Sequence, residues 1–208
     1  VDLGAPTDES ISELDVPDNI LAKLNKLTVD GTGFLVRTEV SEPDTSLVNE
    51  LNNGGSFRIS RIAQDSNFLQ VKTRNSDGMI DLNQLSPLSS QVTWLDLSGT
   101  AISDSSLAAI SNFENLTRLH LSQTDIENNS LQHLKNLAHL EYLNLYGTTI
   151  SDEGLDNLTG LQSLHSLYIW QTEVTETGVE QLQSQLPNLN IDTEIGRASC
   201  RERVSFTV

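Results

Sequence analysis

A 24-residue period constrains the fold of this chain more than any other feature. A column of threonines carries it, at Thr100, Thr124, Thr148 and Thr172. Two columns of apolar residues keep the same step, one five residues and one three residues before each threonine. Repetition at a fixed period of this length is typical of an array in which each unit packs on its neighbours. The sequence therefore predicts a repeat protein.

Each copy of the repeat predicts a strand, a turn and a short helix. The segments LDL, LHL, LNL and LYI alternate apolar and polar residues, as a half-buried strand does. Apolar residues at helical spacing follow in every copy. Ser103, Ser151 and Thr175 stand where the helix N-caps are expected. We expect the strands of successive copies to pair in parallel, and the threonine hydroxyls to bond to the turn backbone.

The four copies, over residues 91–191, resemble leucine-rich repeats, although that family carries Asn where this chain carries Thr. The resemblance implies an α/β fold, namely a right-handed, horseshoe-like βα solenoid with a parallel sheet on its concave face. Arrays of this family usually work as interaction surfaces. The resemblance therefore implies a protein as the partner.

Residues 31–193 are also similar to the C-terminal repeat region of bacterial proteins, from planctomycetes and Bacteroidetes, that carry a c-type cytochrome domain. The phrases QVTWLDLSGTAISD (91–104) and LEYLNLYGTTISDEGL (140–155) carry this similarity. It implies a fragment of a larger exported bacterial protein, located in the periplasm or on the cell surface. No cofactor is expected in this fragment. The first residue is Val, which also favours a fragment or a processed form.

The sequence divides into four expected segments. Residues 1–30 read as a linker and a short helix, and residues 31–90 as degenerate N-terminal repeats or a cap. Within the second segment, GFLVRTEV (33–40) and SFRISRI (56–62) are strand-like, and Asn52 to Gly55 reads as a turn between them. Four leucine-rich repeats of 24 residues over 91–193 and a non-native tail over 194–208 complete the chain.

The tail differs from the rest of the chain in composition. Three arginines fall within seven residues of it, and it holds Cys200, the single cysteine. The run from Glu194 to Val204 resembles, residue for residue, the translation of a common sequencing adaptor. A genuine basic tail is the alternative. We exclude the segment from fold reasoning.

Composition and motifs exclude several classes of function. The 208 residues hold 29 acidic and 12 basic residues, for a net charge of −17, which argues against nucleic acid and anionic membrane as partners. No apolar run reaches the roughly 18–20 residues of a membrane span. Nucleophile elbows, phosphate-binding loops and zinc-protease motifs are missing, and the four histidines do not converge. We expect neither an enzyme nor a metal site.

Aromatic residues gather on one predicted surface. A strand whose leucines face the core points its other residues to the opposite face, which is the concave face of a solenoid. Both tryptophans and all three tyrosines fall in these columns. The expected ligand-binding residues are Trp94, Arg118, His120, Tyr142, Tyr146, Tyr168 and Trp170. Four of them, Tyr142, Tyr146, Tyr168 and Trp170, are expected to form one adjoining patch, while Phe34, Phe57, Phe68 and Phe113 read as core.

The sequence thus predicts a non-catalytic, protein-binding module, because Trp and Tyr are enriched in binding hot spots. Three alternatives stay open. The aromatics could stabilise the sheet by cross-strand packing. The array could be a structural spacer in a membrane-anchored c-type cytochrome protein, or the Tyr and Trp residues could bind a glycan. No membrane segment is expected in this fragment.

Overall fold

The computed structural model describes residues 27–29, 35–37, 40–64, 66–74 and 79–193. The chain divides into two units between Glu39 and Val40. In the first unit, β1 (Leu27–Val29) pairs antiparallel with β2 (Leu35–Arg37), so the expected linker and helix end in a strand. The expectations for residues 1–26 and for the tail lie outside the described residues.

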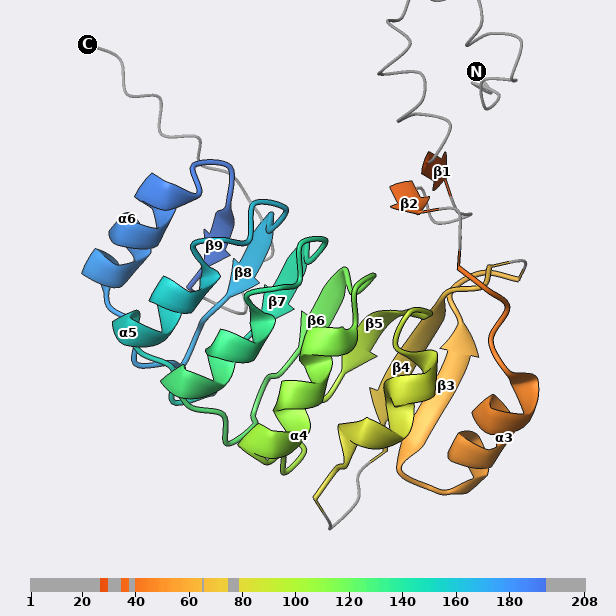
Figure 1. Cartoon of the computed structure of the whole chain (residues 1–208). Helices are drawn as coiled ribbons and strands as arrows, with labels where there is room; N and C mark the ends of the chain where they lie inside the picture. Colours follow the sequence, from red (N-terminus) through yellow and green to blue (C-terminus); the bar gives the residue numbers. More distant parts are fainter. Residues whose placement is uncertain (1–26, 30–34, 38–39, 65, 75–78, 194–208) are drawn as a thin grey trace, which may run out of the picture. The chain divides into compact units, whose positions relative to one another are not determined.

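The second unit holds a seven-stranded sheet in the order β3-β4-β5-β6-β7-β8-β9 (Figure 1). Its strands are β3 (Phe57–Arg61), β4 (Leu69–Thr73), β5 (Val92–Asp96), β6 (Arg118–His120), β7 (Tyr142–Asn144), β8 (Ser166–Tyr168) and β9 (Asn190–Asp192). From β4 to β9 all neighbours are parallel, and β3 runs antiparallel to β4. This arrangement confirms the predicted solenoid with a parallel sheet.

The strand register converts the 24-residue period into straight rows across the sheet. Leu95 pairs with Leu119, Leu119 with Leu143, and Leu143 with Leu167. Side chains that occupy the same place in successive copies are therefore neighbours, about 4.7–4.9 Å apart along the row. Any feature that repeats in the sequence becomes a continuous stripe on the molecule.

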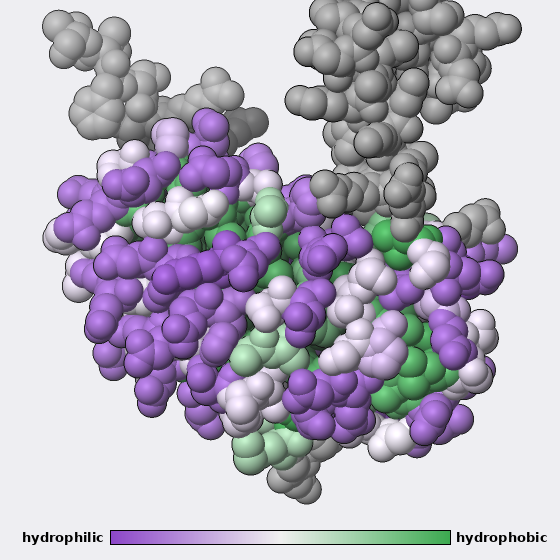
Figure 2. Space-filling view, viewed as in Figure 1, coloured by the Kyte–Doolittle hydropathy of each residue, from purple (hydrophilic) through white to green (hydrophobic). Residues whose placement is uncertain are grey.

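Short helical segments line the other side of the solenoid (Figure 1). They are η1 (Leu82–Leu88), α4 (Asp104–Ala108), η2 (Ala109–Asn112), η3 (Asn128–Leu134), α5 (Asp152–Leu155), η4 (Asp156–Leu158) and α6 (Glu176–Gln185). Four of the seven are 3₁₀-helices, where the sequence suggested α-helical spacing. The tighter winding suits leucines three residues apart, such as Leu82, Leu85 and Leu88, because residues i and i+3 eclipse in a 3₁₀-helix. Hydrophilic side chains cover the surface over α5 and α6 (Figure 2).

Two of the expected N-caps accept the bond that defines them. The Ser103 hydroxyl accepts from the backbone N–H of Ser106 at 3.1 Å, and the Thr175 hydroxyl accepts from that of Gly178 at 3.3 Å. Ser151 occupies the N-cap of α5 without such a bond. The caps end each turn and begin each helix at the place that the sequence indicated.

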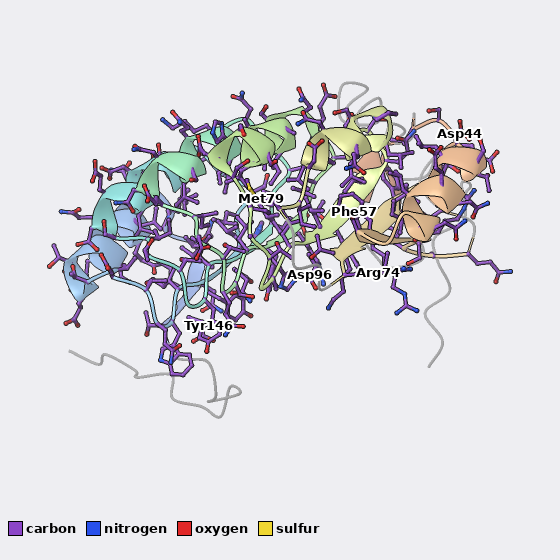
Figure 3. The ribbon with its side chains drawn as sticks, turned by 90° about the horizontal axis from the view of Figure 1, so that it is seen from below. Asp44, Phe57, Arg74, Met79, Asp96 and Tyr146 are labelled. Atoms are coloured by element: carbon purple, nitrogen blue, oxygen red, sulfur yellow. The ribbon has the colours of Figure 1, made fainter. Side chains whose placement is uncertain are left out.

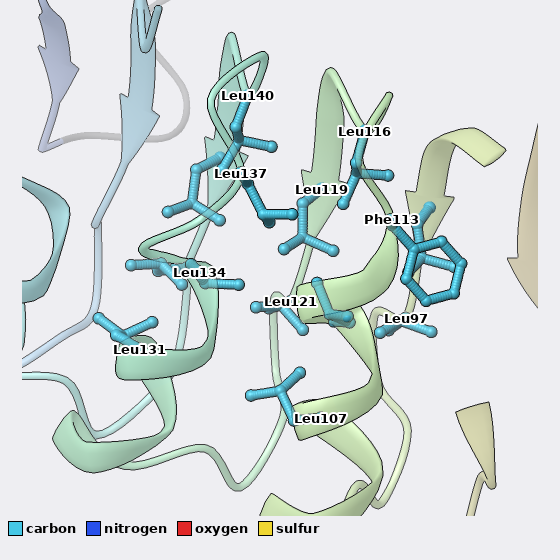
Figure 4. Close-up of a cluster of buried hydrophobic side chains, with 14 of the residues drawn as sticks. Leu97, Leu107, Phe113, Leu116, Leu119, Leu121, Leu131, Leu134, Leu137 and Leu140 are labelled. Atoms are coloured by element: carbon cyan, nitrogen blue, oxygen red, sulfur yellow. The ribbon is translucent and has the colours of Figure 1, made fainter. Parts of the chain in front are cut away.

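The core lies between the sheet and the helical segments (Figure 4). Leu119 and Leu121 from β6 and the turn after it pack with Leu107 and Leu131 from the helical side, and all four are buried. The phenylalanines at 57, 68 and 113 are also buried, as expected, and Phe34 lies outside the described residues. Leucines from the sheet and from the helical segments fill the space between them. The polar residues of each strand therefore point away from the core, on the face of the sheet that we call the inner face.

The threonine column closes the turns after the strands. Thr100, Thr124, Thr148 and Thr172 each donate a hydroxyl hydrogen bond to the carbonyl oxygen three residues earlier, at 2.6–2.7 Å. This confirms the expected bond to the turn backbone. Each bond stays within its own copy, so the column repeats a local turn and does not link one copy to the next.

The start of the second unit differs from a repeat. A helix, α3 (Thr45–Asn53), precedes β3, so Asn52 and Asn53 end a helix and do not form the expected turn between two strands. Asn52 accepts from the Ile59 N–H at 2.8 Å and donates to the Ile59 carbonyl at 3.0 Å. The helix and the antiparallel strand together cover the first edge of the parallel sheet. Residues 31–90 are expected to be either degenerate repeats or a cap. The strand β4 pairs in parallel with β5, as a repeat does, whereas β3 pairs antiparallel with β4, as suits a cap.

Candidate binding surface

The inner face of the sheet carries all seven residues that the sequence singled out. The strand residues among them alternate with buried leucines, and every one of the seven is half-buried. Asp96 and Tyr146 lie on the side of the molecule opposite the helical segments (Figure 3). This placement follows from the two-residue period of a strand, because one face is filled by the core and the other is left for contacts.

Side chains of adjacent strands contact one another on the inner face. The Arg118 guanidinium lies over the Trp94 ring, 4.8 Å from its centroid. The His120 ring is 4.8 Å from the Tyr142 ring, which in turn is 5.0 Å from the Tyr168 ring. Such tilted pairs are a preferred aromatic geometry. In the strand register His120 and Tyr168 belong to one row and Tyr142 to the neighbouring row, so the three rings touch diagonally across three strands. We call this set of three rings the ring row.

A second aromatic pair lies in the turns after the strands. Tyr146 and Trp170 stack with an interplanar angle of 9° and centroids 5.3 Å apart. The residues that follow them, Gly147 and Gln171, both have a positive φ, of 67° and 54°. The Gly147 N–H donates to the Trp170 carbonyl at 3.0 Å, so the two turns are tied together. The ring contacts therefore fall into two groups, where the sequence suggested one patch.

Electrostatics differ along the face. Burial lowers the pKa of His120, with the charges of Arg118 and Lys72 acting in the same direction and that of Asp96 opposing them. Burial also raises the pKa of Tyr142, and the neighbouring Tyr168 adds to the effect. Burial opposes ionisation of Asp96, but hydrogen bonds from Ser98 and Lys72 hold its pKa below the ordinary value. At neutral pH His120 and Tyr142 are therefore uncharged, and Asp96 is a carboxylate.

A hollow of about 670 Å³ lies at the β3–β6 end of the same face. The side chains that line it include Arg58, Lys72, Trp94, Asp96, Arg118 and His120. Sequence reasoning missed Arg58, Lys72 and Asp96. The alternation of β3 and β4, in which Arg58 and Lys72 stand between buried residues, was the signal that could have found them. We call this site the basic hollow.

Two kinds of feature are absent from the described residues, a metal-binding cluster and a membrane-spanning helix. Within them, no group of three His, Cys, Asp or Glu side chains is arranged to hold a metal ion. No helix among the same residues has the length and apolar character needed to cross a membrane. The inner face is thus the surface on which a functional proposal can be built.

A family model described as a leucine-rich repeat matches residues 136–158, which run from the end of one copy through β7 and α5. These residues are similar to a leucine-rich repeat. The same strand, turn and helical segment recur at a 24-residue step from β5 to β9. The whole parallel part of the sheet therefore repeats the strand, turn and helical segment of the matched residues, as a βα solenoid. Tyr142 and Tyr146 lie within the matched repeat.

Several solved leucine-rich repeat structures are similar to this chain. An internalin from Listeria monocytogenes is 25% identical, with a TM-score of 0.45, over 53% of this chain and 44% of that one. A leucine-rich repeat protein from Leptospira interrogans is 22% identical, with a TM-score of 0.41, over 52% and 27% of the two chains. The repeat ectodomain of a receptor kinase from Arabidopsis thaliana is 16% identical, with a TM-score of 0.44, over 74% and 94%. No curated protein sequence matches the chain.

Proposed function

We propose that this chain is a non-catalytic module that binds a protein partner through the inner face of its solenoid. The observation that carries the proposal is the concentration of rings on that face. His120, Tyr142 and Tyr168 contact one another across three strands, and Tyr146 and Trp170 stack beside them in the turns. Aromatic side chains of this kind supply large contact areas and dominate binding hot spots.

The competing explanation is that the rings only stabilise the sheet. Contacts between neighbours are expected in either case, so stability and binding have to be measured separately. Tyr146→Ala and Trp170→Ala break the stack without touching a strand hydrogen bond of the ladder. A binding role predicts a loss of partner affinity of about 2 kcal/mol or more. A loss below about 1 kcal/mol for both variants would show that the stack is structural.

The experiment uses this chain as bait to isolate a partner and then measures affinity by titration calorimetry. Met79→Ala is the matched control, because Met79 is a large apolar side chain, 68% exposed, that does not line the basic hollow or belong to either ring group. We expect it to leave the affinity unchanged. Melting temperatures of all variants separate loss of binding from loss of fold.

The array could also serve as a spacer or bind a glycan. A spacer makes no binding contact through the inner face and therefore tolerates substitution over all of it. If the Tyr146→Ala and Trp170→Ala variants capture the partner as well as the unaltered chain does, that result would favour the spacer. The aromatic rings on the inner face are the feature that favours glycan binding, because an aromatic ring at a protein surface can pack against the apolar face of a sugar. A glycan array, probed with the chain and with Tyr142→Ala, separates this alternative from protein binding.

The proposal extends to the larger protein. The similarity to repeat regions of cytochrome-domain proteins supports a fragment of an exported bacterial protein, in the periplasm or on the cell surface. The reading frame upstream of Val1 tests this directly. A C-x-x-C-H motif and membrane segments in it would support the proposal, and a frame without either would contradict it.

A further inference from the structure

Positive charge is distributed unevenly over this acidic molecule. The net charge is −17. Within residues 40–193 the basic residues are Arg58, Arg61, Lys72, Arg74, Arg118 and Lys135. All but the last lie in, or directly after, the strands β3, β4 and β6. Within residues 40–193 the cations thus gather at the β3–β6 end of the sheet, although the chain as a whole is acidic.

Three of these cations line the basic hollow, namely Arg58, Lys72 and Arg118, against one carboxylate, Asp96. Arg58 and Lys72 are directly opposite each other in the β3–β4 register. Like charges in directly opposed positions destabilise a sheet. A pair that costs stability in the folded molecule needs an explanation outside the sheet.

Of the two opposed cations of β3 and β4, only Lys72 is neutralised by a carboxylate of the described residues. Lys72 forms an ion pair with Asp96 at 2.9 Å. Arg58 is exposed, and among the described residues no carboxylate lies within ion-pair distance of it. Arg61, the other arginine of β3, binds Glu42 at 3.0 Å. The structure therefore satisfies the cation on the core side of β3 and leaves the one on the inner face for a ligand.

The hollow is built to orient what it binds. The Arg118 guanidinium lies over the Trp94 ring, 4.8 Å from its centroid, and this contact restrains the side chain. An arginine that is already restrained can hold a carboxylate through two hydrogen bonds at a lower entropic cost. His120 lines the hollow and also contacts Tyr142. The hollow is thus continuous with the ring row, and a segment seated in it extends over aromatic side chains.

We propose that the basic hollow binds an acidic segment of a protein partner, with an Asp or Glu carboxylate held by Arg58 and Arg118 and the rest of the segment running over His120 toward Tyr142. This proposal rests on the protein-binding function proposed above. Charge complementarity selects the occupant. Charges beyond about 8 Å are screened at physiological ionic strength, so a short acidic segment experiences mainly the local cations. A long polyanion such as a nucleic acid would also meet the acidic remainder of the chain.

The test selects random short peptides, displayed on phage, for binding to the full chain. We expect the selected peptides to be enriched in Asp and Glu, and their affinity to fall about tenfold in Arg58→Gln/Arg118→Gln. Arg74→Gln/Lys135→Gln removes the same charge outside the hollow and is expected to leave affinity within about twofold. Because Arg58 is exposed, Arg58→Gln alone provides a variant that keeps the fold, checked by its melting temperature.

Four outcomes overturn the acidic-segment proposal. Selected peptides without an excess of acidic residues would do so, as would hollow variants that bind like the unaltered chain. In both of these cases a loss of affinity in Tyr142→Ala would leave the proposed protein-binding function standing. Inorganic phosphate that displaces the peptides as strongly as free glutamate-rich peptide would indicate a small-anion site instead. Failure to select any peptide would contradict both proposals.

Discussion

Single residues in this solenoid have one of two roles, set by the direction of the side chain. Leu145 points to the core and is 0% exposed, whereas its neighbours Asn144 and Tyr146 are half-buried on the inner face. Asn144 also accepts a hydrogen bond from the Tyr146 N–H at 2.9 Å, which fixes the turn that carries the ring. Core and surface positions therefore alternate along the same few residues.

Leu145→Ala should destabilise the fold by about 2–5 kcal/mol, because neighbouring copies cannot fully collapse into the space that the side chain leaves. Urea unfolding followed by circular dichroism gives the free energy of unfolding. His139→Ala, at an exposed position, is the control and should have little effect. A change below about 1 kcal/mol for Leu145→Ala would contradict the assigned register.

His120 should make the stability of the chain depend on pH. Burial lowers its pKa in the folded state, and the neighbouring Arg118 and Lys72 charges do the same. The folded state then binds fewer protons than the unfolded state, whose histidine titrates near pH 6.5. The part of the free energy of unfolding that depends on a neutral His120 is therefore fully present above about pH 6.5. It is lost as the pH falls toward the lower pKa of the folded state.

The measurement compares the unaltered chain with His120→Gln by urea unfolding at several pH values. The free energy of unfolding of the unaltered chain should fall, relative to that of the variant, as the pH drops below about 6.5. The other histidines are present in both proteins and cancel in the difference. Parallel pH curves for the two proteins would refute the prediction.

Elements of successive copies are joined on the helical side by capping side chains. Asn128 accepts from the Ser151 N–H at 2.9 Å and donates to the Ser151 hydroxyl at 2.8 Å. One copy later, the Asp152 carboxylate accepts from the Thr175 N–H at 2.7 Å and from its hydroxyl at 2.6 Å. Asn128 and Asp152 thus each bind the residue at the N-cap of the next copy's helix. The repeats are thus connected by polar bonds at the helices as well as by the strand ladder.

Gly178 leaves the room that one of these connections needs. A Cβ at this position would overlap the Asp152 carboxylate, which its two bonds to Thr175 hold in place. Gly178→Ala should therefore destabilise the chain, although alanine by itself favours a helix interior by about 1 kcal/mol. In an Asp152→Gly background the whole side chain is gone, including the Cβ that lies 3.0 Å from the added atom, and the same substitution should stabilise. Thermal unfolding of the four proteins measures this change of sign, and a Gly178→Ala effect that is equal in both backgrounds would exclude the proposed contact.

The whole molecule is a linear array, and its stability should vary along its length. The copies around β6 and β7 have a neighbour on both sides, while β9 is the last strand of the described sheet. In such arrays stability is a sum of nearest-neighbour contacts, and local opening begins where contacts are fewest. A disturbance at one end should therefore be felt mainly by the adjacent copy.

Hydrogen exchange tests this expectation at the level of the backbone. The amides of Leu119 and Leu143, in the middle of the sheet, should exchange more slowly than that of Ile191 in β9. Mass spectrometry of proteolytic fragments, or nuclear magnetic resonance, resolves the difference. Equal protection throughout the sheet would indicate a single cooperative unit in place of an array.

The sequence by itself determined the features that repeat. The leucine and threonine columns predicted the parallel sheet, the buried face, the turn bonds and the placement of the aromatics, because a fixed period forces equivalent residues into one row. The tertiary structure decided what does not repeat. The helix α3, the antiparallel β3 and the basic hollow depend on contacts that occur only once in the chain, such as those of Asn52 with Ile59 and the pairing of Arg58 with Lys72. No local pattern encodes such contacts, and the separation of the rings into two groups likewise came only from the geometry of the turns.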